Sequence, residues 1–213
     1  MKMLKALICA VGVASASGAQ ASFINYAAKE INCKIVYYGA AALQENIQYI
    51  HARTNPEARG KIVTLKTQGG DVLFFDFLPL ALGEIRGFRV RFHLYAAPGG
   101  SKVGPDARLV LKGTDGVIFV ADSDPKRLPA TLASWESLKT NLAALGYDWR
   151  KLPLVIQLAN RDLPDALPVE SLKQALGVTT QPTFEGVVSR GVGVFDSLKA
   201  AAKLILTELK RGG

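Results

Sequence analysis

One stretch of the chain has the layout of a phosphate-binding loop, but with other residues at the contact positions. An apolar segment over residues 34–38 ends at Gly39, and a helical pattern follows. Such a strand–loop–helix unit can hold phosphate, because backbone N–H groups at a helix N-terminus point toward an anion. Counted from Gly39, the loop motif needs Gly, Lys and Ser or Thr where the chain has Gln44, Glu45 and Asn46. The pattern therefore predicts the strand–loop–helix geometry of a phosphate site without the side chains that would bind phosphate.

The composition is that of a globular domain with a basic surface. The chain has 213 residues, of which 49% are hydrophobic and 21% charged, so it can bury a sizeable core and is not disordered. Its net charge of +8 comes from scattered Lys and Arg residues, which favours a solvated surface over a nucleic-acid site. The sequence has two cysteines, Cys9 and Cys33, which provide neither a disulfide framework nor a metal site.

Residues 1–21 have the pattern of a secretory signal. Lys2 and Lys5 form a basic start, residues 6–14 are apolar, and Ala-Gln-Ala at 19–21 has the form of a signal-peptidase site. We therefore predict a cleaved leader, an exported or periplasmic protein and a mature net charge of +6, since cleavage removes two lysines. The alternatives are an expression leader, a misassigned start codon or an uncleaved anchor. Without a signal the protein would be cytoplasmic, and membrane association stays open.

From residue 22 to residue 213, apolar strands alternate with amphipathic helices. We predict strands over 34–38, 61–66, 72–78, 88–95, 116–121, 154–158 and 184–188, and helices over 46–53, 106–112, 132–145, 168–176 and 194–210. This alternation predicts one α/β domain with a mainly parallel central sheet and helices on both faces. In the strand over 88–95, Arg89, Arg91 and His93 form a basic side, which we interpret as solvated or covered by a loop.

Five segments resemble the MglA family, the bacterial Ras-like GTPases of gliding motility and cell polarity. They are residues 30–39 (EINCKIVYYG), 73–80 (LFFDFLPL), 91–95 (RFHLY), 161–164 (RDLP) and 191–196 (GVGVFD). The resemblance extends over nearly the whole chain after residue 21. It implies the P-loop NTPase-like fold of a small GTPase and allows each nucleotide-binding position to be compared.

In the loop after Gly39, the resemblance places other residues at the phosphate and magnesium positions. Aligned from the helix, the loop is about two residues short of the family pattern. The phosphate-binding Lys then falls at Leu43 and the magnesium-binding Thr at Gln44, and Ala42 completes the shortened loop. In the first switch region, the family's Arg-Thr pair reads Asp71-Val72. An acid thus replaces the group that would stabilise the transferred charge, and Val72 has no hydroxyl for magnesium.

The second switch and the base-recognition motif are kept only in part. Pro98-Gly99 is retained, and Gly100 replaces the family's Gln. The N-K-x-D motif reads Ala159-Asn160-Arg161-Asp162, so that Asp162 is the residue left to accept the guanine N–H groups. The retained Gly39, Gly99 and Asp162 also have structural interpretations as a turn, a loop and an acid at a helix start.

The sequence therefore predicts a pseudo-GTPase that binds a protein partner, with no cofactor expected. Each charge-assisted hydrogen bond contributes about 1.5–3 kcal/mol, so the combined changes weaken nucleotide binding by about 5–8 kcal/mol, or roughly 10⁴- to 10⁶-fold. The resemblance implies that partners, such as an MglB-like regulator or a polarity effector, bind the switch-region face, represented by Phe74, Phe75 and Pro98. One alternative is an atypical GTPase that binds GTP or GDP and Mg²⁺. Another is a decayed or modified gene.

Overall fold

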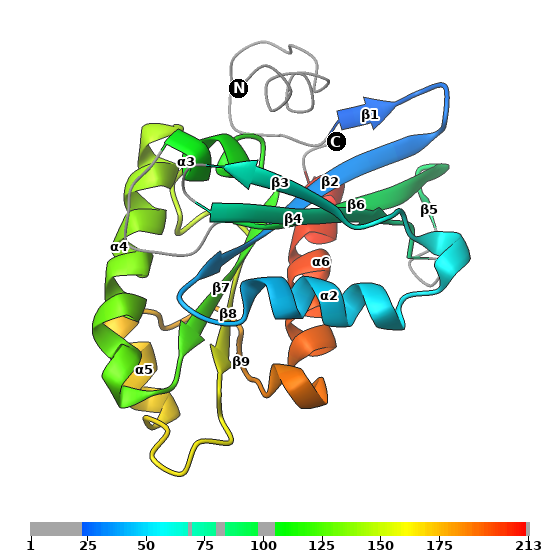
Figure 1. Cartoon of the computed structure of the whole chain (residues 1–213). Helices are drawn as coiled ribbons and strands as arrows, with labels where there is room; N and C mark the ends of the chain where they lie inside the picture. The colour runs from blue at the N-terminus through cyan, green and yellow to red at the C-terminus, as the bar shows by residue number, and fades with distance from the viewer. Residues whose placement is uncertain (1–22, 68–69, 80–83, 98–104, 212–213) are drawn as a thin grey trace.

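The computed structural model describes residues 23–67, 70–79, 84–97 and 105–211, which form one sheet with helices on both faces (Figure 1). The strands are β1 (Phe23–Asn25), β2 (Glu30–Gly39), β3 (Val63–Thr67), β4 (Gly70–Phe77), β5 (Glu84–Ile85), β6 (Phe88–Ala96), β7 (Gly116–Asp122), β8 (Leu154–Ala159) and β9 (Thr183–Glu185). The helices are α2 (Leu43–Arg53), α3 (Pro105–Leu111), α4 (Leu128–Ala144), α5 (Val169–Leu176) and α6 (Val194–Arg211). Short 3₁₀ turns occur at Pro56–Ala58, Pro125–Arg127 and Val188–Arg190. The predicted leader lies outside the described residues.

The strand order confirms the predicted mainly parallel α/β sheet. The order is β3-β4-β6-β2-β7-β8-β9, and β6, β2, β7, β8 and β9 run parallel to one another. Strands β3 and β4 form an antiparallel pair at one edge. Two short strands that the sequence pattern did not predict, β1 and β5, pair antiparallel with β2 and β6. The predicted strand over 184–188 ends at Glu185, and a 3₁₀ turn follows.

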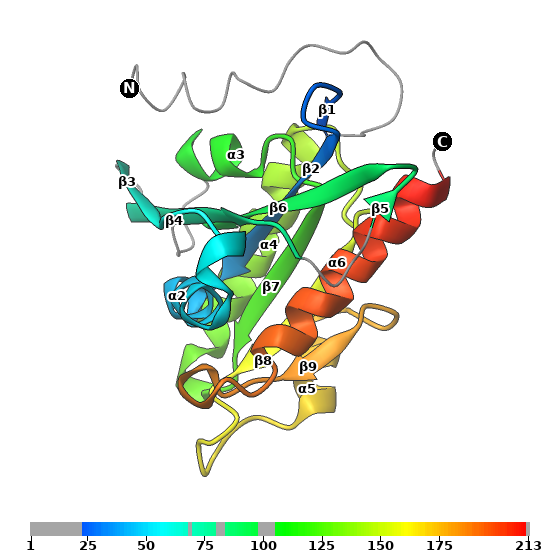
Figure 2. The same cartoon turned by 90° about the vertical axis from the view of Figure 1, so that its right-hand side faces the viewer.

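The sheet separates two apolar cores, because alternate residues of a strand point to opposite faces. In β2, Ile35 and Tyr37 pack on the side of α2 and α6, whereas Val36 and Tyr38 pack on the side of α3, α4 and α5. Figure 2 shows the two helical layers with the sheet between them. All seven residues of β7 are buried, as expected for a parallel strand covered on both faces. The predicted helices on both faces are confirmed.

A buried polar network fixes the start of α2 against the centre of the sheet. The Asn46 side chain donates to Gln157 Oε1 on β8 at 2.8 Å and accepts from Gln157 Nε2 at 3.1 Å. Gln157 also donates to Ser197 Oγ of α6 at 3.2 Å. Because these buried groups satisfy one another, α2, β8 and α6 are held in one arrangement. The N-terminus of α2 is thereby set at the carboxyl edge of the sheet.

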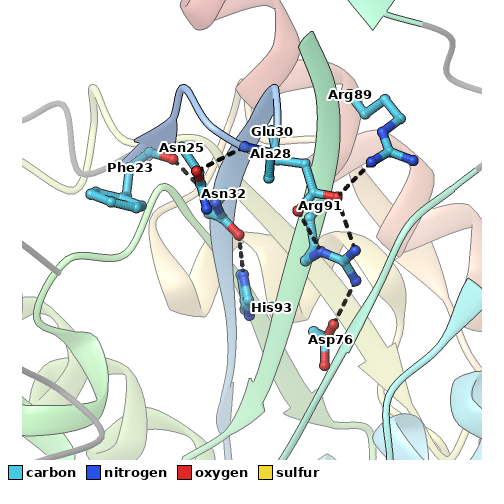
Figure 3. A network of polar contacts seen from close by, with 9 residues as sticks. All are labelled: Phe23, Asn25, Ala28, Glu30, Asn32, Asp76, Arg89, Arg91 and His93. Carbon is cyan, nitrogen blue, oxygen red and sulfur yellow. Dashed lines mark hydrogen bonds and ion pairs between the residues drawn. The ribbon is translucent and has the colours of Figure 1, made fainter. Parts of the chain in front are cut away.

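The basic side of β6 is exposed or half-exposed and carries an ion-pair network that the sequence pattern did not predict (Figure 3). Arg91 donates to both carboxylate oxygens of Glu30, at 2.9 and 3.0 Å, and to Asp76 Oδ2 at 2.7 Å. Arg89 also donates to Glu30, at 3.2 Å. His93 Nε2 lies 2.8 Å from Asn32 Oδ1. The network links β2, β4 and β6, with the Glu30 side chain nearly buried.

Replacing Arg91 with Met is expected to lower the free energy of unfolding at pH 7 by about 2 kcal/mol, because it leaves the Glu30 carboxylate without its main partner. The hydrogen bond from Arg91 holds the pKa of Glu30 below its ordinary value. A lowered pKa means that the stabilisation is complete above the unfolded-state pKa and is lost as the pH falls through the folded-state pKa. The deficit of the variant should therefore shrink below about pH 4.

Urea unfolding between pH 7 and pH 3 measures this difference, and Arg108→Met on the exposed side of α3 is the matched control. The control should lie within about 0.5 kcal/mol of the parent at every pH. A deficit for Arg91→Met that stays constant over the whole range would show that Glu30 is not the group through which Arg91 acts.

Candidate functional site

A cleft of about 640 Å³ lies at the carboxyl ends of β2, β7 and β8. Its lining comes from the loop before α2, from α2 itself, and from the segments that follow β7, β8 and β9. The lining residues are Ala40, Ala41, Ala42, Glu45, Gln48, Tyr49, Asp122, Arg127, Asn160, Asp162, Val187, Val188 and Ser189. Open parallel sheets bind ligands at this edge, where the helix N-termini point.

The loop between β2 and α2 passes very close to β7. Gly39 has φ 150°, and a Cβ atom there would lie 2.1 Å from the carbonyl oxygen of Val120. The next residue, Ala40, donates its N–H to the same oxygen at 3.1 Å. Ala42 adopts a left-handed conformation (φ 50°) and begins α2 without a side-chain cap. Gly39 is therefore required by strand packing, independently of any ligand.

The first turn of α2 places one acid in the cleft. Glu45 is exposed and lines the cleft, whereas Leu43 is only 7% exposed and packs in the core. Gln44 donates its side-chain N–H to the carbonyl oxygen of Asp71 at 3.3 Å. Asn46 is buried in the network with Gln157. In this turn, the side chain that reaches the cleft is thus negatively charged.

A second acid forms the floor of the cleft. Asp122 is buried at the end of β7, accepts a hydrogen bond from Asn160 Nδ2 at 2.8 Å, and pairs with Arg127 at 3.5 Å. Arg127 also donates to the carbonyl oxygen of Ala40 at 3.2 Å. Asn160 holds a left-handed conformation (φ 60°) that directs the chain toward Asp162. The Arg127 guanidinium is thus engaged by groups of the protein itself.

The far wall of the cleft carries Asp162, whose side chain is 46% exposed. Its carboxylate lies 3.8 Å from the Arg190 guanidinium, which is a loose ion pair. The neighbouring Arg161 points elsewhere and pairs with Glu185 at 2.8 Å. Asp162 therefore keeps its oxygens accessible to a ligand that donates N–H groups.

The structure brings together only some of the residues that the sequence singled out. Ala42, Asn160 and Asp162 line the cleft, and Gly39 borders it. Leu43 and Val72 lie in the core, and Val72 is only 1% exposed. 

Of the expected partner-binding residues, Phe74 stacks on Tyr95 with ring centroids 5.1 Å apart and is partly exposed. The expectation that Phe75 binds a partner is wrong, because its side chain is buried against His51 and offers no surface to a partner. Pro98, Gly99 and Gly100 lie outside the described residues.

Sequence reasoning missed Asp122 and Arg127, which shape the floor of the cleft. A signal was present for Asp122, because it directly follows the apolar run predicted as a strand over 116–121. A carboxylate at the carboxyl end of a buried parallel strand points to the ligand edge of such a sheet. Arg127 had no comparable signal, since its role depends on the packing of the turn at Pro125–Arg127 beside the loop after β2.

The parallel sheet with an antiparallel edge pair, together with a cleft at its carboxyl edge, defines the chain as a small-GTPase-like α/β protein. No protein-family model matches the sequence. The chain is 54% identical over 194 residues to the mutual gliding-motility protein MglA of Myxococcus xanthus (strain DK1622), a match that covers 90% of this chain and 100% of that protein. The chain therefore belongs to the MglA-like Ras-superfamily small GTPases, which confirms the predicted family and fold.

Proposed function

We propose that this protein is an MglA-type pseudo-GTPase, which acts by binding a partner protein and does not switch with nucleotide. The observation that carries the proposal is the charge of the cleft. Among the lining residues, Glu45 occupies the first turn of α2, where phosphate would lie. Arg127 is held by Asp122 and by the carbonyl oxygen of Ala40. A triphosphate there would meet the Glu45 carboxylate, and the cation that lines the cleft, Arg127, already pairs with Asp122.

The positions that the family uses for phosphate and magnesium support the same proposal. Leu43 is packed in the core and Val72 is buried, so neither offers a group to a phosphate or a metal ion. Gln44 is bonded to the backbone of Asp71. The residues at these three positions thus do not fit the phosphate and Mg²⁺ contacts of the family.

The expected loss of binding free energy indicates how weakly the cleft would bind GTP. Charge-assisted hydrogen bonds contribute about 1.5–3 kcal/mol each, and a carboxylate beside a phosphate adds repulsion. The absence of the Lys, the Thr and part of the base contact weakens binding by roughly 10⁴- to 10⁶-fold. This reduction turns a tight nucleotide site into one that is marginal at cellular GTP concentrations.

The partner surface that follows from this proposal is the switch-region face. Phe74 and Tyr95 form a stacked aromatic pair on β4 and β6, and Phe74 is partly exposed. Aromatic side chains of this kind are enriched at protein interfaces. A protein related to the MglB-type regulators, or a polarity effector, is the candidate partner. Export, if residues 1–21 are a cleaved signal, would place that partner outside the cytoplasm.

A second candidate is an atypical GTP-binding switch, which the exposed carboxylate of Asp162 favours. Magnesium-dependent GTP turnover distinguishes the two, together with an assay for copurified nucleotide on protein from the native host. We expect no turnover above the buffer rate and no bound guanine nucleotide. The comparison variant carries a loop lengthened by two residues, with Lys and Thr restored at the family positions. Turnover by the parent chain, or stoichiometric bound GDP, would contradict the pseudo-GTPase proposal.

A further inference from the structure

The end of the molecule opposite the cleft carries two tight hairpins that are joined to each other. The β1–β2 hairpin turns at Lys29 (φ 50°), and the β5–β6 hairpin turns at Arg86 (φ 53°). Arg89 donates its backbone N–H to the carbonyl oxygen of Lys29 at 2.9 Å. The rings of Tyr26 and Phe88 meet edge to face, with centroids 5.7 Å apart. These contacts make the two hairpins one structural unit.

Exposed apolar side chains gather on the first hairpin. Phe23, Ile24 and Tyr26 are 40%, 41% and 75% exposed, although all three are large. The other large apolar side chains with such exposure among the described residues are Val63 and Val192, which lie on separate elements. Phe23 and Ile24 are consecutive residues of β1 and so point to opposite faces, which gives the hairpin an exposed apolar side chain on each face, with Tyr26 in the turn.

Exposed basic side chains lie on the same two hairpins. Lys29, Arg86 and Arg89 are exposed on the hairpins. The last turn of α6 adds Lys210 and Arg211, and both views place the C-terminal end of α6 at the same end of the molecule (Figures 1 and 2). We call the two hairpins and this last turn the hairpin end.

The carboxylates in the same elements pair with part of this basic charge. Glu30 is nearly buried and accepts hydrogen bonds from Arg91 and Arg89. Glu84 and Glu208 are the exposed acids, and Glu208 pairs with Arg211 at 3.0 Å. Among the described residues, the exposed cations of the hairpin end therefore outnumber its exposed acids.

We propose that the hairpin end docks on the surface of a phospholipid bilayer with anionic headgroups. Aromatic and aliphatic side chains flanked by Lys and Arg suit the boundary between headgroups and acyl chains, where the apolar parts are buried and the cations meet lipid phosphate.

Docking in this orientation would leave the cleft and the switch-region face accessible. The cleft lies at the carboxyl ends of β2, β7 and β8, whereas the hairpins lie at the amino-terminal ends of β2 and β6. No helix among the described residues is long and apolar enough to cross a membrane. The inference does not depend on whether the cleft binds nucleotide.

Vesicle co-sedimentation of the full chain tests the inference. Vesicles of phosphatidylcholine alone are compared with vesicles that contain about 30% phosphatidylglycerol, at about 0.1 M and about 0.5 M salt. We expect binding to the anionic vesicles at low salt and its loss at high salt. The double variant Lys29→Glu, Lys210→Glu should weaken binding by at least about tenfold, because each cation near the surface contributes to affinity.

The matched control is Lys199→Glu, Lys203→Glu, which makes the same charge change on the exposed side of α6 away from its last turn. This control should bind within about threefold of the parent if position, and not net charge, determines binding. Tyr26→Ser removes an exposed ring and should independently weaken binding about threefold. The melting temperature of each variant confirms that it is folded.

Three results would overturn the inference. Equal sedimentation with both kinds of vesicle at both salt concentrations would show that the apolar run over 6–14 binds lipid by itself. Equal loss in the two double variants would show a net-charge effect. Absence of vesicle binding in a chain that sediments as a dimer would show that the hairpin end is covered by a second copy.

Discussion

Leu43→Lys is expected to destabilise the protein by about 3 kcal/mol and to restore no nucleotide binding. Aligned from the helix, Leu43 stands where the family has its phosphate-binding Lys, yet the structure buries its side chain in the core with Ile47 and Ile50. A lysine there loses the apolar packing of Leu43 and brings an ammonium group toward the core. The N-terminus of α2 also disfavours a positive charge.

Urea unfolding measures the change, and Gln48→Lys is the control, because Gln48 is an exposed cleft residue on the same helix. The same added charge at position 48 should alter the free energy of unfolding by less than about 0.5 kcal/mol. A Leu43→Lys protein as stable as the parent, with measurable GTP affinity, would show that the lysine reaches the cleft and that the two-residue difference in loop length has no effect.

Gly39→Ala is expected to lower the free energy of unfolding by about 3–5 kcal/mol. The new Cβ atom would lie 2.1 Å from the carbonyl oxygen of Val120, and this atom belongs to the backbone of a neighbouring strand. Relief requires β2 and β7 to move apart at the point where Ala40 hydrogen-bonds to Val120. Overpacking and backbone strain of this kind cost about 1–3 kcal/mol each.

Gly146→Ala is the matched control, since Gly146 also has a positive φ (82°) but has open space around it. It should cost about 1 kcal/mol, the strain of the left-handed conformation alone. If the two substitutions cost the same, the packing role of Gly39 is wrong, and its presence after β2 needs an explanation from ligand binding.

The elements that the sequence predicted well are those with a strong local pattern. The strand β7 was predicted from a continuous apolar run over 116–121, and α6 from apolar residues at helical spacing. The strands β1 and β5 were missed, because three and two residues carry no periodicity and exist only through pairing with β2 and β6. Helix α4 begins at Leu128, four residues before the predicted start, with Pro129 in its first turn.

The candidate site was predictable in position and not in detail. The strand, Gly39 and the helix start located the cleft, because a parallel sheet places such a loop at its carboxyl edge. The register of the loop was not decided by the sequence, since counting from Gly39 placed the Lys position at Glu45 and aligning from the helix placed it at Leu43. The structure shows that the first is buried and the second lines the cleft.

The ion-pair network was not predictable for a different reason. Arg91 meets a partner 61 positions away on β2 and another 15 positions away on β4, so a sequence pattern along β6 shows only its alternation. The same holds for Arg127, whose contact with Ala40 spans 87 positions. Contacts of this kind depend on strand order and side-chain direction, which a single sequence does not encode in any local pattern.

The melting temperature of the full chain with and without about 1 mM GTP and Mg²⁺ is the most direct test of the pseudo-GTPase proposal. A ligand that binds the native state with micromolar affinity would add about 4 kcal/mol at this concentration, which corresponds to a rise of roughly 8–16 °C for a domain of this size. We predict a change of less than about 1 °C, because Glu45 repels phosphate and Arg127 already pairs with Asp122. A magnesium-dependent rise of several degrees would contradict the proposal.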